Sequence, residues 1–269
     1  MRMGTAGTGS CPTGPALASA PLRAVPRILT DFSSEPWSTA SVASVAAALA
    51  PSCDAVLVGE HQDRPDFPPT LHASLLLAAG VRPWMTLTCR DRNRIVLEQV
   101  FDLDGTRLAA LAGSVGVRPA VAETPTAPPR PLRGFRLLQK QRAGAAVAVL
   151  NHASVTAVAG FIAAAARAGV TIPVIAAVAV FTDELSATVL SALPGLELDP
   201  AAVRAVLDHP DPVAAGIEAA AREARTLLAI PGVAGVNISG LASARGYSYG
   251  AQVKAELAER IRAGDGHDH

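Results

Sequence analysis

The sequence predicts an α/β fold built on a parallel sheet. Short apolar runs alternate with longer alanine-rich runs along most of the chain, a pattern typical of strand–helix–strand units. Polar residues gather where the apolar runs end, which is where parallel α/β proteins place their functional groups. Half of the 269 residues are hydrophobic, so the chain can bury a sizeable core.

Composition and charge narrow the class of partner. Basic and acidic residues number 23 each, so no excess of positive charge predicts binding to nucleic acid or anionic lipid. The three cysteines, Cys11, Cys53 and Cys89, are far apart in sequence, which argues against a disulfide framework or a metal cluster and favours the reducing cytoplasm. No apolar run reaches the roughly 20 residues that span a membrane. We therefore expect a small-molecule partner.

Three segments are expected. Residues 1–26 are rich in Gly, Pro, Ala, Ser and Thr and are interpreted as a flexible tail without a secretory signal. Residues 27–262 carry the alternating pattern and form the folded domain. Residues 263–269 are interpreted as a second flexible tail.

The first part of the domain is predicted to alternate strictly. Strands are expected at 27–32, 55–58 and 81–88, and helices at 38–50 and 70–79. Parallel strands need a long crossover, usually a helix, so this order favours a parallel sheet.

The pattern changes after the third strand. Asp91 is a suitable N-cap for a helix over 95–99, which runs almost directly into a second helix over 106–116. No strand is predicted between the two helices.

Alternation then resumes and continues to the end of the domain. The expected strands are 117–122, 145–150, 171–180 and 233–238. The expected helices are 132–143, 154–168, 200–208, 212–228 and 248–262. Seven strands are therefore predicted in all.

Three short motifs resemble one protein family. Residues 88–94, with the sequence TCRDRNR, resemble a signature of the methylenetetrahydrofolate reductase family. Residues 101–104 (FDLD) are similar to a helix start in that family, and residues 140–145 (KQRAGA) are similar to its Lys-x-x-Ala-Gly-Ala turn. The resemblance runs in order from about residue 27 to residue 262.

The resemblance implies a TIM-type (β/α)8 barrel. The barrel is expected to be incomplete, with seven recognisable strands, because the family's fourth strand and its Gly-Asp pair have no counterpart here. A doubly wound open sheet would show the same alternation, but no Gly-x-Gly-x-x-Gly motif opens a helix and no Walker motif is present.

The implied activity is reduction of 5,10-methylenetetrahydrofolate to 5-methyltetrahydrofolate with NAD(P)H, in one-carbon metabolism and methionine supply. Asp31 stands where the family has the first-strand carboxylate that acts as the acid. Glu35 is the alternative acid, and an Asp31 that only caps its loop is the alternative interpretation.

Substrate contacts are expected from three residues. Asn151 stands where the family has a Gln that reaches the pterin and the nicotinamide. Glu60 and His61 follow the second strand and could supply an acid, a base or a ligand, although a histidine in such a loop is more often structural.

The family's cofactor is FAD, and the resemblance places five residues in its neighbourhood: Thr88, Arg90, Asp91, Asn93 and Lys140. Lys140 is one of only two lysines and could meet a phosphate as a point charge, or could simply favour its helix end. No metal site is predicted.

The departures from the family's pattern leave two further hypotheses. In the first, FAD has been lost and NAD(P)H delivers hydride to the folate directly, with Asp31 as the acid. In the second, the shortened barrel is impaired or non-catalytic and acts as a folate-binding, flavin-binding or partner subunit. Association of identical subunits is compatible with each hypothesis.

Overall fold

The computed structural model describes residues 25–59, 66–86, 105–193, 196 and 198–264. The strands are β1 (Ile28–Asp31), β2 (Ala55–Val58), β3 (Pro83–Met85), β4 (Ala120–Glu123), β5 (Val147–Leu150), β6 (Val174–Phe181) and β7 (Val233–Ala242). The helices are α1 (Thr39–Leu49), α2 (Pro69–Ala78), α4 (Gly105–Ser114), α5 (Arg133–Arg142), α6 (Val155–Ala168), α7 (Glu184–Ser191), α8 (Pro200–Leu207), α9 (Pro212–Leu228) and α10 (Tyr247–Gly264), with a 3-10 turn, η1 (Arg130–Leu132).

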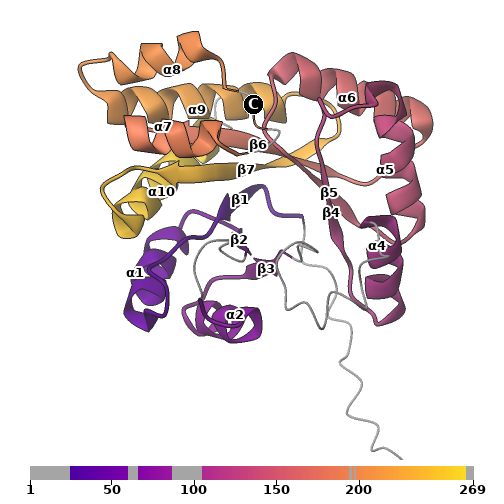
Figure 1. The fold of residues 1–269 in the computed structure, drawn as a ribbon, viewed down its shortest axis with the longest axis horizontal. Coiled ribbons are helices and arrows are strands. Elements are labelled where there is room, and N and C mark those ends of the chain that lie inside the picture. The colour runs from indigo at the N-terminus through magenta and orange to yellow at the C-terminus, as the bar shows by residue number, and fades with distance from the viewer. Residues whose placement is uncertain (1–24, 60–65, 87–104, 194–195, 197, 265–269) are drawn as a thin grey trace, which may run out of the picture.

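The seven strands form one parallel sheet in the order β3-β2-β1-β7-β6-β5-β4. The last strand pairs with the first, as in a closed (β/α) barrel, while β3 and β4 lie at the two outer positions. Figure 1 shows the strands in the middle of the molecule and the helices around them. The prediction of an incomplete TIM-type barrel with seven strands is confirmed.

Among the strands that the structure describes, β3 and β4 do not pair, so the described ring is interrupted between them, where the resemblance predicted a missing fourth strand. Residues 87–104, which include the helix expected at 95–99, lie outside the described residues. Most of both predicted tails also lies outside them.

The sheet is curved, so side chains from strands that are far apart along it meet on one face. The inner cluster consists of Leu29, Ala55, Val147 and Ile175, with Val25, Leu57, Trp84, Ala146 and Val149 packed against it. It combines residues of β1, β2 and β3 with residues of β5 and β6, and β7 separates these two groups of strands in the sheet. The sheet therefore has a concave face that is filled by apolar side chains.

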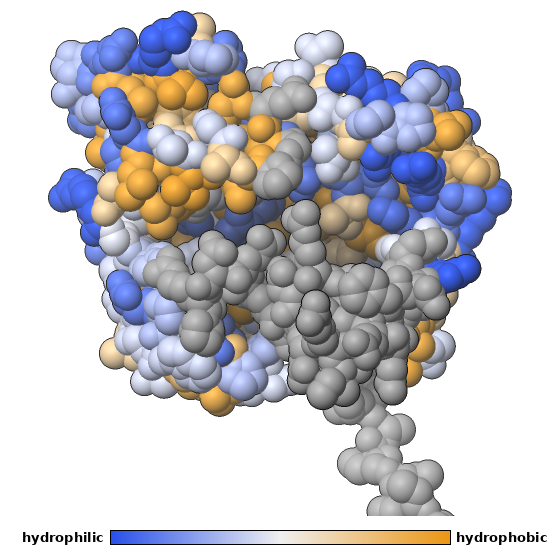
Figure 2. All heavy atoms as spheres, in the orientation of Figure 1, coloured by the Kyte–Doolittle hydropathy of each residue, from blue (hydrophilic) through white to orange (hydrophobic). Residues whose placement is uncertain are grey.

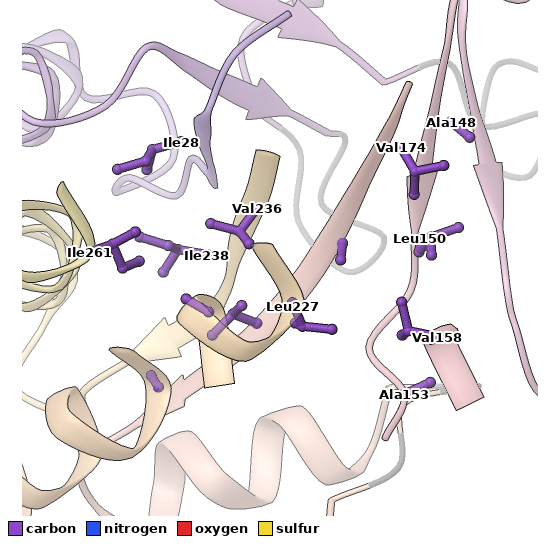
Figure 3. Close-up of a cluster of buried hydrophobic side chains, with 14 of the residues drawn as sticks. Ile28, Ala148, Leu150, Ala153, Val158, Val174, Leu227, Val236, Ile238 and Ile261 are labelled. Atoms are coloured by element: carbon purple, nitrogen blue, oxygen red, sulfur yellow. The ribbon is translucent and has the colours of Figure 1, made fainter. Parts of the chain in front are cut away.

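The opposite face of each strand packs against the helices. A second cluster, called the outer cluster, includes Ile28, Leu137, Leu227, Val236 and Ile261. Figure 3 shows strand side chains of this cluster meeting side chains of α9 and α10. Successive residues of a strand point to opposite faces, so membership of the inner or outer cluster tells which way a strand residue faces.

Local sequence explains several of the helix boundaries. The Ser38 hydroxyl accepts a hydrogen bond from the Ser41 N–H at the start of α1, and Ser154 does the same for Ala157 at the start of α6. Gly169 ends α6 with φ of 92°, a left-handed conformation that favours glycine.

Two elements differ from the sequence prediction. Helix α7 follows β6 directly, where only a polar strand tip was expected. Strand β7 continues to Ala242, four residues beyond the predicted end at residue 238. Exposed apolar side chains recur at four-residue spacing from α7 onward, at Leu185, Val189 and Leu193, and Figure 2 shows hydrophobic surface in this part of the molecule.

Within the described part of the chain, no helix is both long and apolar enough to cross a membrane.

Candidate functional site

Asp31 ends β1 at the carboxyl edge of the sheet. Ile28 belongs to the outer cluster and Leu29 to the inner cluster, so the alternation of β1 places Asp31 on the concave face with Leu29. The structure places Asp31 where the sequence predicted it, at a strand end in the barrel interior. Its role as an acid stays a prediction.

Two polar residues of β7 face the same side. Val236 and Ile238 belong to the outer cluster, so Asn237 and Ser239 point to the concave face. Both side chains are buried. Buried amide and hydroxyl groups nearly always have hydrogen-bond partners, so partners are expected for these two side chains.

The side chains of Asp31, Asn237 and Ser239 form one hydrogen-bonded group, which we call the β1–β7 polar cluster. Asn237 Nδ2 donates to Asp31 Oδ1 at 3.0 Å and to Ser239 Oγ at 2.8 Å. A carboxylate only accepts hydrogen bonds, so this contact fixes the orientation of the amide. Asn237 Oδ1 is therefore turned away from Asp31, and no described residue donates to this buried atom.

Lys254, on α10, holds the main chain of β1 from the helix side. Its Nζ donates to the Asp31 carbonyl oxygen at 2.8 Å, and the side chain is buried. Burial lowers the pKa of Lys254, and the nearby Asp31 charge opposes that change. Asp31 is thus fixed twice, by Lys254 at its carbonyl group and by Asn237 at its carboxylate.

A small pocket adjoins Asp31 between the ends of β1 and β7 and helix α10. Its polar lining includes Asp31, Ser33, Tyr247 and Lys254.

Cys53 is near Lys254, and burial raises the pKa of its thiol to about 12, so this cysteine is a poor nucleophile.

Asn151 follows β5 at the same edge of the sheet. Its main-chain N–H donates to the Glu123 carbonyl oxygen at 2.8 Å, and its Nδ2 donates to Thr124 Oγ1 at 2.9 Å. The side chain is exposed at the carboxyl end of the sheet, which is compatible with the predicted substrate contact.

Lys140 lies on the outer face of the sheet, which the helices cover. Its Nζ is 2.6 Å from Glu123 Oε1 and 2.9 Å from the Ala122 carbonyl oxygen. Glu123 shares its face of β4 with Val121, which packs in the outer cluster, so the ion pair lies between β4 and α5. The structure does not bring Lys140 together with Asp31, which is four strands away along the sheet and on its concave face.

The remaining predicted site residues, Glu60, His61, Thr88, Arg90, Asp91 and Asn93, lie outside the described residues. Lys140 is the one predicted flavin neighbour that the structure describes, and its ammonium group is already paired with a buried carboxylate. The other four predicted flavin neighbours lie outside the described residues, so FAD binding stays a prediction.

Three residues of the site were missed from the sequence. Asn237 and Ser239 alternate with apolar residues in the last strand, a pattern that predicts two polar groups on one face. Lys254 is the second of the two lysines and shares a helix face with Gly250 and Leu257, which are both buried. Either signal could have identified them.

Among the residues that the structure describes, no cluster of three or more His, Cys, Asp and Glu side chains could hold a metal ion.

No model of a known protein family and no curated protein matches the chain. A solved structure with a similar fold is the dihydropteroate synthase of Thermus thermophilus, determined in complex with 6HMPPP. The match covers 88% of this chain and 94% of that chain, with 15% sequence identity and a TM-score of 0.49. A likeness at this level assigns neither a family nor a ligand.

Proposed function

We propose that the protein is an enzyme that binds a reduced folate at the carboxyl ends of the strands and reduces its methylene bridge with NADH or NADPH, as methylenetetrahydrofolate reductases do. The observation that carries the proposal is the Asp31 carboxylate on the concave face, oriented by Asn237. The motifs at residues 88–94 and 140–145 support the choice of substrate class.

The chemistry needs one acid and one hydride donor. Asp31 in its protonated form gives its proton to N10 of 5,10-methylenetetrahydrofolate as the bond between the methylene carbon and N10 breaks. The electron pair of that bond goes to N10, and the methylene carbon remains on N5 as an iminium ion. Hydride transfer from the dihydronicotinamide to that carbon gives the 5-methyl product and NAD(P)⁺, and Asp31 regains a proton from water.

The hydride is proposed to pass directly from the nicotinamide to the folate. Support comes from Lys140, whose charge is engaged by Glu123 behind β4 and not presented at the concave face. No step of the proposed reaction therefore passes through FAD.

An anaerobic assay of the purified protein with NADH and methylenetetrahydrofolate tests the proposal. The wild type is expected to form 5-methyltetrahydrofolate, and Asp31→Asn is expected to lower kcat/KM by about 100-fold or more, because the amide cannot donate the required proton. Glu35→Gln, which changes the alternative acid, is expected to keep most of the activity.

Three results would count against it. A folded wild type without turnover would refute the reductase activity, and equal rates for wild type and Asp31→Asn would refute the acid. A yellow protein that releases flavin on denaturation would refute direct hydride transfer.

A binding subunit is the second candidate function. It is favoured by the open order of the described sheet, in which β3 and β4 do not pair. This candidate predicts folate binding without NADH oxidation, and the same affinity in Asp31→Asn if the carboxylate has no role.

A further inference from the structure

We propose that the outward face of α7 is a contact surface for a second copy of this chain, which packs against it antiparallel across a two-fold axis. The surface consists of Leu185, Val189 and Leu193, and we call it the α7 stripe. None of these residues lines the pocket beside Asp31 or takes part in the proposed reaction, so the inference does not depend on the proposed function.

Helix α7 carries apolar side chains on both of its faces. Its inner face buries Ala187 and Leu190 in a hydrophobic cluster. Its outer face carries the α7 stripe, with exposed fractions of 52% at Leu185, 39% at Val189 and 46% at Leu193. Figure 2 shows hydrophobic surface over this helix. A helix on the surface of a monomer normally turns polar side chains to water, so the stripe is expected to be covered by a partner.

The helix that carries the stripe is anchored to the sheet. Asp183 and Ser186 form the capping box at its start. A Cβ atom on Gly240 of β7 would lie 2.9 Å from Leu190 Cδ2, so the inner face of α7 packs directly on that strand. The Leu193 N–H donates to the Leu190 carbonyl oxygen at 3.1 Å, which fixes the end of the stripe. A surface that is already fixed loses little conformational entropy when a partner binds.

Charge favours a second copy as the partner. Residues 185–196 include no charged residue, although 17% of the chain is charged. Contacts between different proteins use charged groups for specificity, whereas interfaces between identical subunits are more apolar. The formal net charge of the chain is zero at pH 7, so two copies do not repel each other at long range.

The spacing of the stripe fits a two-fold axis. Its three residues follow one another at four-residue intervals, so they form one row along the helix that reads Leu, Val, Leu in either direction. An antiparallel second copy therefore places Val189 against its own Val189, and Leu185 against its Leu193. Rows of this kind interdigitate in the commonest class of helix pairs, and the smaller valine at the centre lets the two helices approach closely.

The contact is small, so the association is expected to be weak. The 8 residues of α7 span about 12 Å along the helix axis. Such a contact covers much less than the roughly 800 Å² per partner of a standard interface. We therefore expect a reversible equilibrium between monomer and dimer with a Kd of about 100 µM.

Sedimentation equilibrium of the full chain at concentrations up to about 500 µM tests the inference. With the expected Kd, the weight-average mass should rise with concentration, to more than about a third above the 27.4 kDa of the monomer. A mass that stays at the monomer value at every concentration would overturn the inference and leave the stripe to a partner of another kind.

A charge at the centre of the stripe tests both the surface and its symmetry. Val189→Glu and Val189→Lys each bring two like charges together at the two-fold axis, so each is expected to raise the Kd at least about tenfold. An equimolar mixture of the two variants is expected to regain association, because opposite charges then meet. Val115→Glu, at an exposed valine after α4, makes the same change in net charge as Val189→Glu and is expected to associate like the wild type.

Two results with these variants would also overturn the inference. Unchanged association of Val189→Glu would place the contact elsewhere, and a mixture that stays monomeric would show that Val189 does not meet itself. Val189 is partly exposed, so a charged side chain can reach water and both variants are expected to fold, which circular dichroism checks. If one variant does not fold, the wild-type series and the other variant still decide.

Discussion

Glu123 is a carboxylate whose side chain has no exposed area, and two basic residues of α5 accompany it. Lys140 Nζ lies 2.6 Å from one of its oxygens, and Arg133 Nη1 lies 3.4 Å from the other. A charge in such a position is tolerated when it is paired, and removing one partner leaves it uncompensated. Lys140 is therefore a structural partner of β4 whatever else it binds.

We expect Lys140→Met to lower the free energy of unfolding by about 1–3 kcal/mol, because Arg133 alone compensates Glu123 incompletely. Urea unfolding followed by circular dichroism measures the change. Arg136→Met, at an exposed position of the same helix, is the control and should change stability by less than about 0.5 kcal/mol. Equal effects of the two substitutions would contradict the importance of the buried pair.

Single-residue placement was predictable where it follows from strand ends. Asp31 and Asn151 come directly at the end of apolar runs, and both are found at the carboxyl edge of the sheet. The partner of Lys140 was not predictable, because the contact depends on α5 folding back on β4 and on the inward direction of Glu123. Sequence spacing alone contains neither fact.

At the scale of elements, Asp183 connects two loops of the carboxyl edge. Its Oδ1 accepts from the Ser186 N–H at the start of α7, and its Oδ2 accepts from the Ala244 N–H between β7 and α10. Burial alone would raise the pKa of Asp183, but these hydrogen bonds outweigh burial and lower it.

The sign of the pH dependence follows. A carboxyl group whose folded-state pKa is lowered contributes stability above its unfolded value of about 4, and this contribution disappears as the pH falls through the folded value. Asp183→Ala is expected to cost about 1–3 kcal/mol at pH 7, and the difference from wild type should shrink when the pH falls below about 4.

Asp199→Ala provides the comparison, because Asp199 caps α8 by a hydrogen bond from the Ala201 N–H. It should cost about 1 kcal/mol, less than Asp183→Ala. Urea unfolding of both variants at neutral and acidic pH measures the contrast, and a loss at Asp183 that is independent of pH would contradict the role given to its charge.

Helix α7 shows why one element escaped the sequence prediction. Its start is a capping box in which Ser186, not Glu or Gln, occupies the third position, and the helix has only 8 residues. Longer helices with alanine-rich sequences, such as α6 and α9, were predicted within a few residues of their ends. Long helices with strong hydrophobic periodicity can therefore be predicted from sequence more readily than short ones.

At the scale of the whole molecule, the described sheet has inner strands and two edge strands, whereas a closed barrel has no edge strand. Strands β6 and β7 are long, lie near the middle and pack on α9, while β3 and β4 have one paired neighbour each. The seven strands were predictable from alternation of apolar and helical runs. Their order was expected only through the resemblance, because alternation alone is shared by open and closed parallel sheets.

Hydrogen exchange is expected to reflect this order. Backbone amides of 174–181 and 233–242 should exchange slowest, and those of 83–85 and 120–123 should exchange earlier, because opening an outer strand breaks fewer contacts. Native-state exchange followed by mass spectrometry measures the ranking. Uniform protection of all seven strands would indicate a closed barrel.

The engagement of Lys140 by Glu123 and of Lys254 by the Asp31 carbonyl has a practical consequence. Both lysine side-chain amines of the sequence are hydrogen-bonded within the fold, so acylating reagents and amine cross-linkers should modify these two lysines more slowly in the native protein than in the unfolded chain. A rise in lysine labelling would therefore report the loss of native structure.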